Sequence, residues 1–95
     1  MTPVWSPETI EDLAALRAYI EQYDPAAARK VALHILHNIE ELLPSNPDMG
    51  RSGRVPGTRE LVIPNTPFIV PYRVLGTTIQ ILRIFHGARR WPESF

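Results

Sequence analysis

The sequence predicts a single two-layer α+β domain, in which a short N-terminal strand precedes an antiparallel helical hairpin packed on a three- to four-stranded antiparallel sheet. Two helical patterns fill the first half of the chain, and each begins with a capping residue followed by proline. Three strand-like runs separated by turns fill the second half. At 95 residues the chain is long enough for one hydrophobic core, so we expect residues 1–95 to form one domain.

The composition, 44% hydrophobic and 21% charged, is typical of a globular protein. The chain has no cysteine, which excludes a disulfide framework, a thiolate metal site and a cysteine nucleophile. His34, His37 and Glu41 fall at helical spacing, but nothing else supplies the remaining ligands, so we expect no metal and no cofactor. The first residues lack the basic start and apolar core of a signal peptide, which favours a cytoplasmic location without membrane contact.

Residues 1–5 predict an edge strand, where Pro3 is tolerated although it cannot donate a ladder hydrogen bond. Ser6 is the predicted N-cap of the first helix and Pro7 its first residue, and the helix is expected to run to about Tyr23. Its apolar positions recur at steps of three and four, which predicts a stripe facing the core. The stripe consists of Ile10, Leu13, Leu16 or Ala14, Ile20 and Tyr23.

The second helix begins with the same signal, Asp24 as N-cap followed by Pro25, and Pro44 is expected to end it. Because almost no loop separates the two helices, they must pack as an antiparallel hairpin. The apolar face of the second helix consists of Ala28, Val31, Ala32, Ile35, Ile39, Leu42 and Leu43.

The second half begins with a surface connection, residues 44–57, which is rich in Pro, Gly, Ser, Asn and Asp. Residues 58–63 and 68–74 predict two strands joined by a turn at 64–67. Pro71 lies inside the second of these strands and lacks a ladder donor, so we expect a bulge or an outward-facing position there.

After a tight turn at residues 75–77, residues 78–85 predict the strongest strand of the protein. This strand is apolar on both faces, with Ile79, Ile81 and Phe85 on one side and Leu82 and Ile84 on the other. The helical hairpin can cover one face. The other face needs the chain's own termini or a partner, because contiguous exposed apolar surface usually marks an interaction site.

The formal net charge of zero conceals a division between the two halves. Residues 1–50 carry three basic and eight acidic side chains, a net charge of −5, whereas residues 51–95 carry seven arginines and two glutamates, a net charge of +5. This polarity predicts a basic surface suited to an anionic partner.

The helical hairpin and three later segments together resemble the RelE/ParE family of bacterial toxins from type II toxin–antitoxin modules. The segments are residues 50–63 (GRSGRVPGTRELVI), 68–74 (FIVPYRV) and 81–92 (ILRIFHGARRWP). The resemblance covers nearly the whole chain. It implies a small growth inhibitor that is neutralised by an antitoxin, whose C-terminal segment wraps the toxin and whose N-terminal part binds the operator DNA. Contact with operator DNA would then occur only through the antitoxin.

The resemblance leaves two activities open, because RelE-like members cut mRNA in the ribosomal A site whereas ParE-like members inhibit DNA gyrase and are not nucleases. In a metal-independent endoribonuclease, Arg59, Arg73 and Arg83 would hold the phosphate if they share a face, and His86 would move the proton of the ribose 2′-hydroxyl. Alternatively, Arg73 is a scaffold residue and His86 orients the chain end. Glu60 is expected to form an ion pair with its neighbour Arg59, and the alternative is a role as general base.

A second set of candidates consists of exposed groups that would contact the target or the antitoxin. Arg89, Arg90 and Trp91 combine two guanidinium groups with an indole, which suits a base, a carboxylate or a helix. Arg51 and Arg54 belong to a glycine-containing segment that lacks the spacing of a phosphate-binding loop and is expected to be a turn. The alternative for the first three is plain packing of the tail.

The charge favours the ParE-like interpretation, in which the chain acts on a protein such as DNA gyrase and is not an enzyme. Contact with ribosomal RNA depends on cationic charge, yet the isoelectric point is near 6.8. RelE-like enzymes also carry a lysine pair, whereas Lys30 is the single lysine here and lies on a helix. A third hypothesis is a non-toxic scaffold that binds an antitoxin for autoregulation. In every case we expect the antitoxin segment to be acidic.

Overall fold

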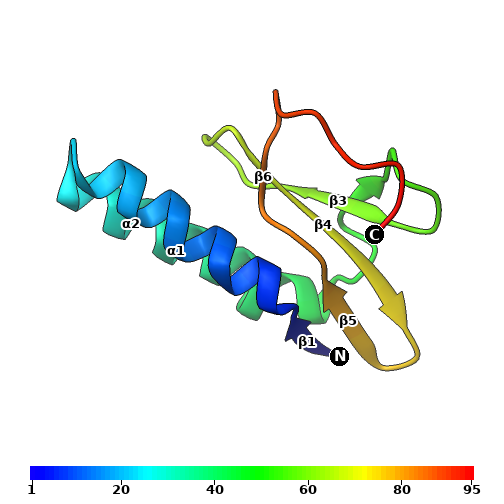
Figure 1. Ribbon diagram of the computed structural model, residues 1–95. Coiled ribbons are helices and arrows are strands. Elements are labelled where there is room, and N and C mark those ends of the chain that lie inside the picture. Colours follow the sequence, from blue (N-terminus) through cyan, green and yellow to red (C-terminus); the bar gives the residue numbers. More distant parts are fainter.

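A computed structural model describes all residues, 1–95, and confirms the α+β class, with two antiparallel helices in one layer and a sheet in the other (Figure 1). No helix is long and apolar enough to cross a bilayer. In chain order the elements are β1 (Thr2–Trp5), α1 (Pro7–Glu21), α2 (Pro25–His37), a π-helical turn η1 (Asn38–Leu42), a 3-10 turn η2 (Leu43–Ser45), β2 (Arg51–Ser52), β3 (Arg59–Val62), β4 (Phe68–Leu75), β5 (Thr78–Ile81) and β6 (Phe85–His86).

The sheet is larger than predicted and it is mixed rather than antiparallel. Its strand order is β1-β5-β4-β3-β2, and β6 pairs with the beginning of β4. Strands β2 and β6 have two residues each, too short to give a periodic pattern in the sequence. Strand β1 runs parallel to β5, with Thr2 opposite Thr78. A parallel pair needs a long connection, which the helical hairpin and the strands after it provide.

Strand β1 lies at the free edge of the sheet, and its proline suits that place. The amides of Thr2 and Ser6 donate to the carbonyl oxygens of Thr77 and Ile81, so alternate residues of β1 face β5. Pro3 falls between them and its nitrogen faces outward, where no donor is needed. A proline at this position also blunts the edge against pairing with another chain.

Both helix starts lie where the sequence predicts them. The hydroxyl of Ser6 accepts a hydrogen bond from the Thr9 amide (3.1 Å), and the carboxylate of Asp24 accepts one from the Ala27 amide (3.1 Å). The α-helical part of the second helix ends at His37, earlier than predicted, whereas the helical turns end at Ser45, one residue after Pro44. After His37 the chain continues as the π-helical turn and then the 3-10 turn Leu43–Ser45, whose first residues tolerate a proline.

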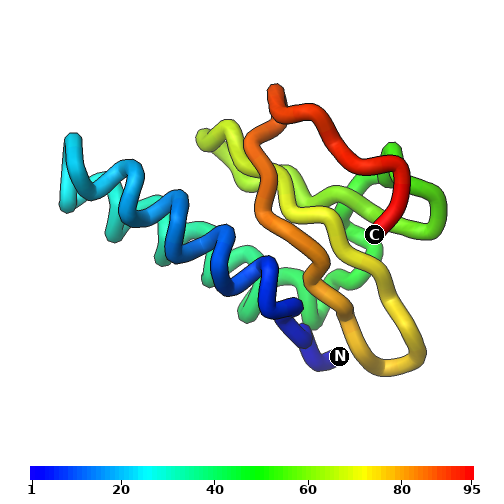
Figure 2. Tube along the Cα trace, in the orientation of Figure 1, coloured from blue at the N-terminus to red at the C-terminus, as the bar shows by residue number.

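The second helix carries most of the helical contribution to the core, and α1 carries little. Ile35, Ile39 and Leu43 are fully buried against the sheet. In the predicted stripe of α1, however, Ile10 is 59% and Tyr23 74% exposed. Tyr23 lies just after α1, at the far end of the hairpin, which extends past the sheet (Figures 1 and 2), so it has no sheet to pack on. Ile10 lies in the first turn of α1, where its neighbour Thr9 is buried and Ile10 itself faces solvent. The core on the sheet consists of Leu61, Ile63, Val70, Tyr72, Ile79, Ile81 and Ile84.

The predicted strand 78–85 is interrupted between β5 and β6, and Pro71 explains where. Pro71 lies in regular register opposite Glu60 and is buried, without the expected bulge. Its carbonyl accepts a hydrogen bond from the Leu82 amide (3.0 Å), but it has no N–H to return to the Leu82 carbonyl. The hydroxyl of Ser6 donates to that carbonyl instead (2.9 Å), so the chain leaves the ladder here.

After the interruption, residues 83 and 84 make their hydrogen bonds to α1 instead of to a neighbouring strand. The carboxylate of Asp12 accepts hydrogen bonds from the amide of Ile84 (3.0 Å) and from the guanidinium of Arg83. The extra residue in this segment changes which side chains share a face. Ile84 joins the core with Ile79 and Ile81, whereas Phe85, predicted on their side, faces away from the helices and is covered by the C-terminal tail.

Candidate functional site

Arg59 and Arg73 do not share a face of the sheet, and Arg83 lies in the interruption between β5 and β6 rather than in a strand. Arg59 is opposite Tyr72 in the β3–β4 register, and Tyr72 is buried in the core between sheet and helices. Arg73 follows Tyr72 in β4, and successive side chains of a strand point to opposite faces. Arg59 therefore lies on the helix side of the sheet and Arg73 on its outer face, the face away from the helices. A phosphate held by one of them is out of reach of the other.

Arg59 fixes the loop before β2. Its guanidinium donates to the Gly50 carbonyl (2.9 Å) and lies 3.5 Å from the Asp48 carboxylate. The hydroxyl of Tyr72 secures the same loop, because it accepts from the Gly50 amide (2.9 Å) and donates to the Pro47 carbonyl (2.7 Å). Burial raises the pKa of Tyr72 against the lowering effect of the Gly50 amide, so this phenol stays protonated and suits a structural role.

Arg73 and Arg83 are also engaged within the chain. The Nε of Arg73 donates to the Gln80 amide oxygen across the β4–β5 pair (2.7 Å). Arg83 makes a two-pronged pair with Asp12 (2.8 and 2.9 Å), and these hydrogen bonds raise the pKa of Arg83 further. The guanidinium of Arg83 also lies 4.8 Å from the centre of the Phe85 ring. The carboxylate and ring hold Arg83 in one place.

Glu60 pairs with Arg51 and Arg54 rather than with its neighbour Arg59, which points to the other face. Arg51 donates to Glu60 Oε1 at 2.9 Å, and Arg54 donates to Oε2 through its main-chain amide (2.8 Å) and its Nε (3.0 Å). Burial opposes ionisation of this carboxyl, but the hydrogen bonds from Arg54 and Arg51 outweigh it, and the pKa of Glu60 is lowered. The segment 51–54 is therefore a short strand and a turn closed over one buried carboxylate.

His86 is the one candidate catalytic residue that is free to act. It is exposed in β6, opposite Phe68, and the two rings make an edge contact with centroids 6.1 Å apart. Its Nδ1 accepts a hydrogen bond from the Ala88 amide (3.1 Å), so the ring proton lies on Nε2. The ring therefore presents a donor to solvent, and no strand arginine contacts it.

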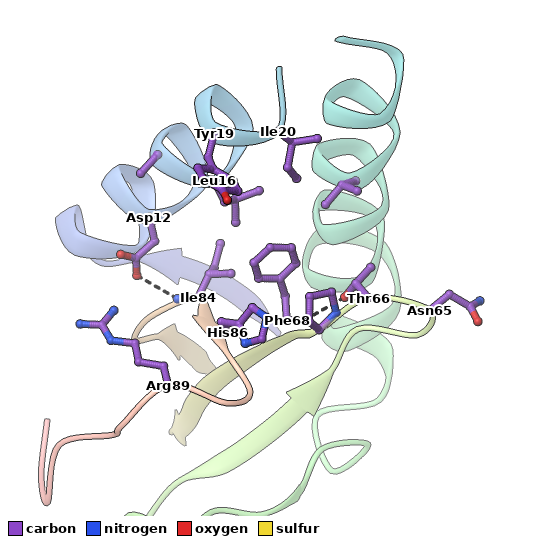
Figure 3. A pocket seen from close by; sticks show the side chains of 13 residues that line it. Asp12, Leu16, Tyr19, Ile20, Asn65, Thr66, Phe68, Ile84, His86 and Arg89 are labelled. Carbon is purple, nitrogen blue, oxygen red and sulfur yellow. Dashed lines mark hydrogen bonds between the residues drawn. The ribbon is translucent and has the colours of Figure 1, made fainter. Parts of the chain in front are cut away.

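His86 borders a groove of about 660 Å³ between the helical hairpin and the β3–β4 turn (Figure 3). Leu16 and Ile20 of α1 form one wall, and Phe68 and Ile84 point toward them from the sheet. A shallower cleft of about 450 Å³ continues the groove past Val31 and Thr66 to Lys30 and His34. His34 binds the Pro64 carbonyl there (2.8 Å), which accounts for one of the helix histidines. The lining of the groove is completed by Asp12, Ala15, Tyr19, Val31, Asn65, Thr66, Pro67, His86 and Arg89.

The residues Arg89, Arg90 and Trp91 do not form one patch. The guanidinium of Arg54 lies 3.8 Å from the centre of the Trp91 indole, and Arg89 lies 4.6 Å from the centre of the Phe85 ring. Arg90 is exposed. The tail thus packs on the outer face of the sheet, which was the alternative prediction, while Arg89 also reaches the end of the groove.

Sequence reasoning did not find the groove or the role of Asp12. The groove combines several apolar residues of α1 with others that are distant in sequence, Val31, Phe68 and Ile84, and Asp12 pairs with residues more than seventy positions away. The only available signal was the surplus of apolar residues on the predicted stripe of α1, which needs a cover that the sheet does not supply.

Three comparisons with known proteins agree on the family. The family described as "ParE toxin of type II toxin-antitoxin system, parDE" matches residues 4–91. The putative toxin Y4kP of Sinorhizobium fredii is 37% identical over 89 residues, 94% of this chain and 91% of that protein. Toxin RelE2 of Caulobacter vibrioides is 35% identical over 86 residues, 90% of this chain and 94% of that protein. The structure of a chromosomal ParDE toxin–antitoxin system from P. aeruginosa superimposes with a TM-score of 0.77 and 32% identity, over 90% of this chain and 95% of that one.

The fold and these matches define the toxin component of a type II toxin–antitoxin system. The chain belongs to the ParE toxin family, as the resemblance in the sequence predicts. The matched proteins carry both ParE and RelE names, so the choice between the two activities has to rest on the geometry of the site.

Proposed function

We propose that this toxin is of the ParE-like kind, a growth inhibitor that acts by binding a protein target, DNA gyrase, and not by cutting RNA. The observation that supports it is the arrangement of the strand arginines. Arg59 and Arg73 project from opposite faces of the sheet, and Arg83 is held by Asp12. A phosphoryl-transfer site needs several preorganised donors around one phosphate. The near-neutral charge of the whole chain supports the same proposal.

The RelE-like alternative is carried by His86, whose exposed ring borders the groove together with Arg89. A histidine and an arginine at the edge of an open groove are the minimum for moving a proton beside a phosphate. The third hypothesis, a scaffold without toxicity, would leave the same surfaces for an antitoxin. These alternatives differ in what they do to growth and to purified targets.

The first prediction is the result of a paired assay. The purified protein is expected to inhibit supercoiling by DNA gyrase and to leave mRNA intact on programmed ribosomes. His86→Ala is expected to inhibit gyrase as the parent does, since His86 is exposed and outside the core. Ribosome-dependent cleavage that disappears in His86→Ala would establish the RelE-like activity instead. Expression without any growth defect would contradict both and favour the scaffold.

We further propose that the groove receives the antitoxin. Its floor is apolar, and Lys30 and Arg89 stand at its two ends without an ion pair. Such a surface suits an amphipathic segment with apolar anchors in the middle and carboxylates toward the ends. This assigns Arg89 to the antitoxin and agrees with the acidic antitoxin segment that the charge division predicts.

The second prediction concerns a charge placed in that groove. Ile20→Asp is expected to weaken antitoxin binding by about ten- to a hundredfold, because an interfacial carboxylate would be buried unpaired, at a cost of roughly 1.4–2.8 kcal/mol. Ile10→Asp is the matched control, since Ile10 lies on the same helix but is exposed and outside the groove. Titration calorimetry at two salt concentrations measures both. Equal affinities of the two variants would place the antitoxin elsewhere.

A further inference from the structure

Residues 90–95 lie across the outer face of the sheet, where Trp91 and Phe95 contact the Phe85 ring and the Arg54 guanidinium lies on Trp91. The final main-chain hydrogen bond of the chain runs from the Arg89 amide to the His86 carbonyl, and residues 90–95 make no hydrogen bond or ion pair. Trp91 contacts the ring of Phe85 edge-on, with centroids 5.0 Å apart, and Phe95 stacks on the same ring at 6.1 Å. We call residues 90–95 the strap. Figure 1 shows it turning back from β6 toward β3 and β4.

The strap fits the surface beneath it imperfectly. The indole Nε1 of Trp91 is buried and donates to nothing, and a buried donor without a partner costs about 1–3 kcal/mol. Glu93 makes no ion pair, although Arg73 and Arg83 line a hollow of about 340 Å³ beside Ser94 and Phe95. Release of the strap would return the indole N–H to water. It would break no hydrogen bond or ion pair, and beyond the aromatic contacts with Phe85 it would lose only the contact of the Arg54 guanidinium with the Trp91 ring.

The surface beneath the strap combines an aromatic ring with arginine side chains. Phe85 is buried beneath the strap, and the guanidinium groups of Arg54, Arg83 and Arg89 lie against aromatic rings of this cluster. Arg73 stands beside it with only its Nε engaged. A site of this kind accepts an aromatic ring between Phe85 and a guanidinium group, and it attracts carboxylates around that ring.

We propose that the strap is displaceable and that the surface beneath it is a docking site for an acidic protein segment that carries an aromatic side chain. The segment places its ring where Trp91 lies and its carboxylates against the free nitrogen atoms of Arg73 and against Arg54. Charge complementarity supports this occupant, because Arg73 and Arg89 at this surface make no ion pair, whereas Arg54 and Arg83 are paired with Glu60 and Asp12. Phe85, Trp91 and Arg73 lie on the side of the sheet away from the groove, and Arg89 is the one residue that also lines it. The proposal rests on Phe85 and Arg73, so it does not depend on the function proposed above.

The strap competes with any such segment as a tethered ligand. A short tether gives an effective concentration in the millimolar range, so loosening the strap should strengthen binding of an external peptide by at least about tenfold. The probe is a fluorescein-labelled peptide, Glu-Glu-Ser-Trp-Glu-Glu-Phe-Glu. Its anisotropy is titrated with the full chain and with the double variant Trp91→Ala/Phe95→Ala. Tighter binding to the double variant is expected, and equal affinities would overturn the proposal.

Two further variants test the charge in the proposal. Added to the double variant, Arg73→Ala is expected to weaken peptide binding at least about fivefold, whereas Arg17→Ala, on an exposed face of α1, leaves it unchanged. A peptide with lysine in place of glutamate is expected not to bind. Equal effects of Arg73→Ala and Arg17→Ala, or binding of the lysine peptide, would overturn the acidic partner. A dimer of the chain that excludes the peptide would show that a second copy occupies the surface, and would also overturn it.

A third experiment leaves Trp91 and Phe95 unchanged, so it does not depend on whether the double variant folds. In Trp5→Phe, Trp91 is the only tryptophan of the chain. Saturation with a peptide in which phenylalanine replaces tryptophan is expected to shift the Trp91 emission to the red, because the indole moves from Phe85 into water. An unchanged emission at saturation contradicts displacement of the strap.

Discussion

Glu60→Gln is expected to reduce the free energy of unfolding by about 2 kcal/mol, because the carboxylate is buried and accepts five hydrogen bonds from two arginines. Breaking a fully buried ion pair costs about 3–5 kcal/mol. The smaller value applies here because Arg51 and Arg54 are about half exposed and can turn to water. Urea denaturation measures the loss. Glu21→Gln, at an exposed glutamate of α1, is the control and should change little.

The difference in unfolding free energy between the parent and Glu60→Gln is expected to depend on pH, and the direction follows from the pKa of Glu60. Because the pKa of Glu60 is lowered in the folded protein, the unfolded chain binds this proton at a higher pH than the folded one. Its stabilisation is complete above the unfolded value, about 4.3, and is lost as the pH falls through the lower folded value. The gap in unfolding free energy between the parent and Glu60→Gln should therefore shrink between pH 7 and pH 3. A gap that stays constant would show that the charge of Glu60 is not what stabilises the segment.

The fold could be predicted from the sequence because its signals are local. Ser6 with Pro7, and Asp24 with Pro25, mark two helix starts through hydrogen bonds that span three residues. The strands were predicted from strand-like runs bounded by turns. What local signals cannot give is the partner of each strand, and for this reason the parallel pairing of β1 with β5 was not predicted.

At Pro71 the sequence predicts a disturbance of the sheet, but the structure shows it in the neighbouring segment and not at Pro71 itself. A proline in a strand removes one donor, which predicts a bulge or an outward orientation. In the structure the strand stays regular and the neighbouring chain gives way, because Ser6 supplies the hydrogen bond that Pro71 cannot. Whether β4 bulges or its neighbour leaves the ladder depends on the hydroxyl of Ser6, which is distant in sequence. Residues 68–74 alone are compatible with either result.

The candidate site was predictable as a set of residue types but not as an arrangement. The sequence identifies the arginines as the basic half of the chain, yet a shift of one residue in register moves a side chain to the other face. Arg59 and Arg73 are separated in that way. The ion-pair partners of the arginines were not predicted either. The sequence predicts a pair between Glu60 and its neighbour Arg59, whereas in the structure Glu60 pairs with Arg51 and Arg54.

Asp12→Ala is expected to be the most damaging polar substitution, with a loss of about 3 kcal/mol in the free energy of unfolding. One carboxylate binds the Arg83 guanidinium twice and the Ile84 amide once, at 2.8–3.0 Å, and its removal leaves both groups without a partner. For a domain of this size the expected fall in melting temperature is roughly 10–20 °C. Glu11→Ala, at the adjacent exposed glutamate, is the matched control.

Two related variants separate the charge from the hydrogen bond to the strand. Asp12→Asn keeps an oxygen for the Ile84 amide and loses the charge, so about half of the destabilisation is expected. Asp12→Ala combined with Arg83→Met removes both members of the ion pair and should be less destabilised than the sum of the single substitutions. If Asp12→Asn were as unstable as Asp12→Ala, the amide of Ile84 would contribute nothing. The interruption between β5 and β6, which places Ile84 in the groove and Phe85 beneath the strap, would then depend on the ion pair alone.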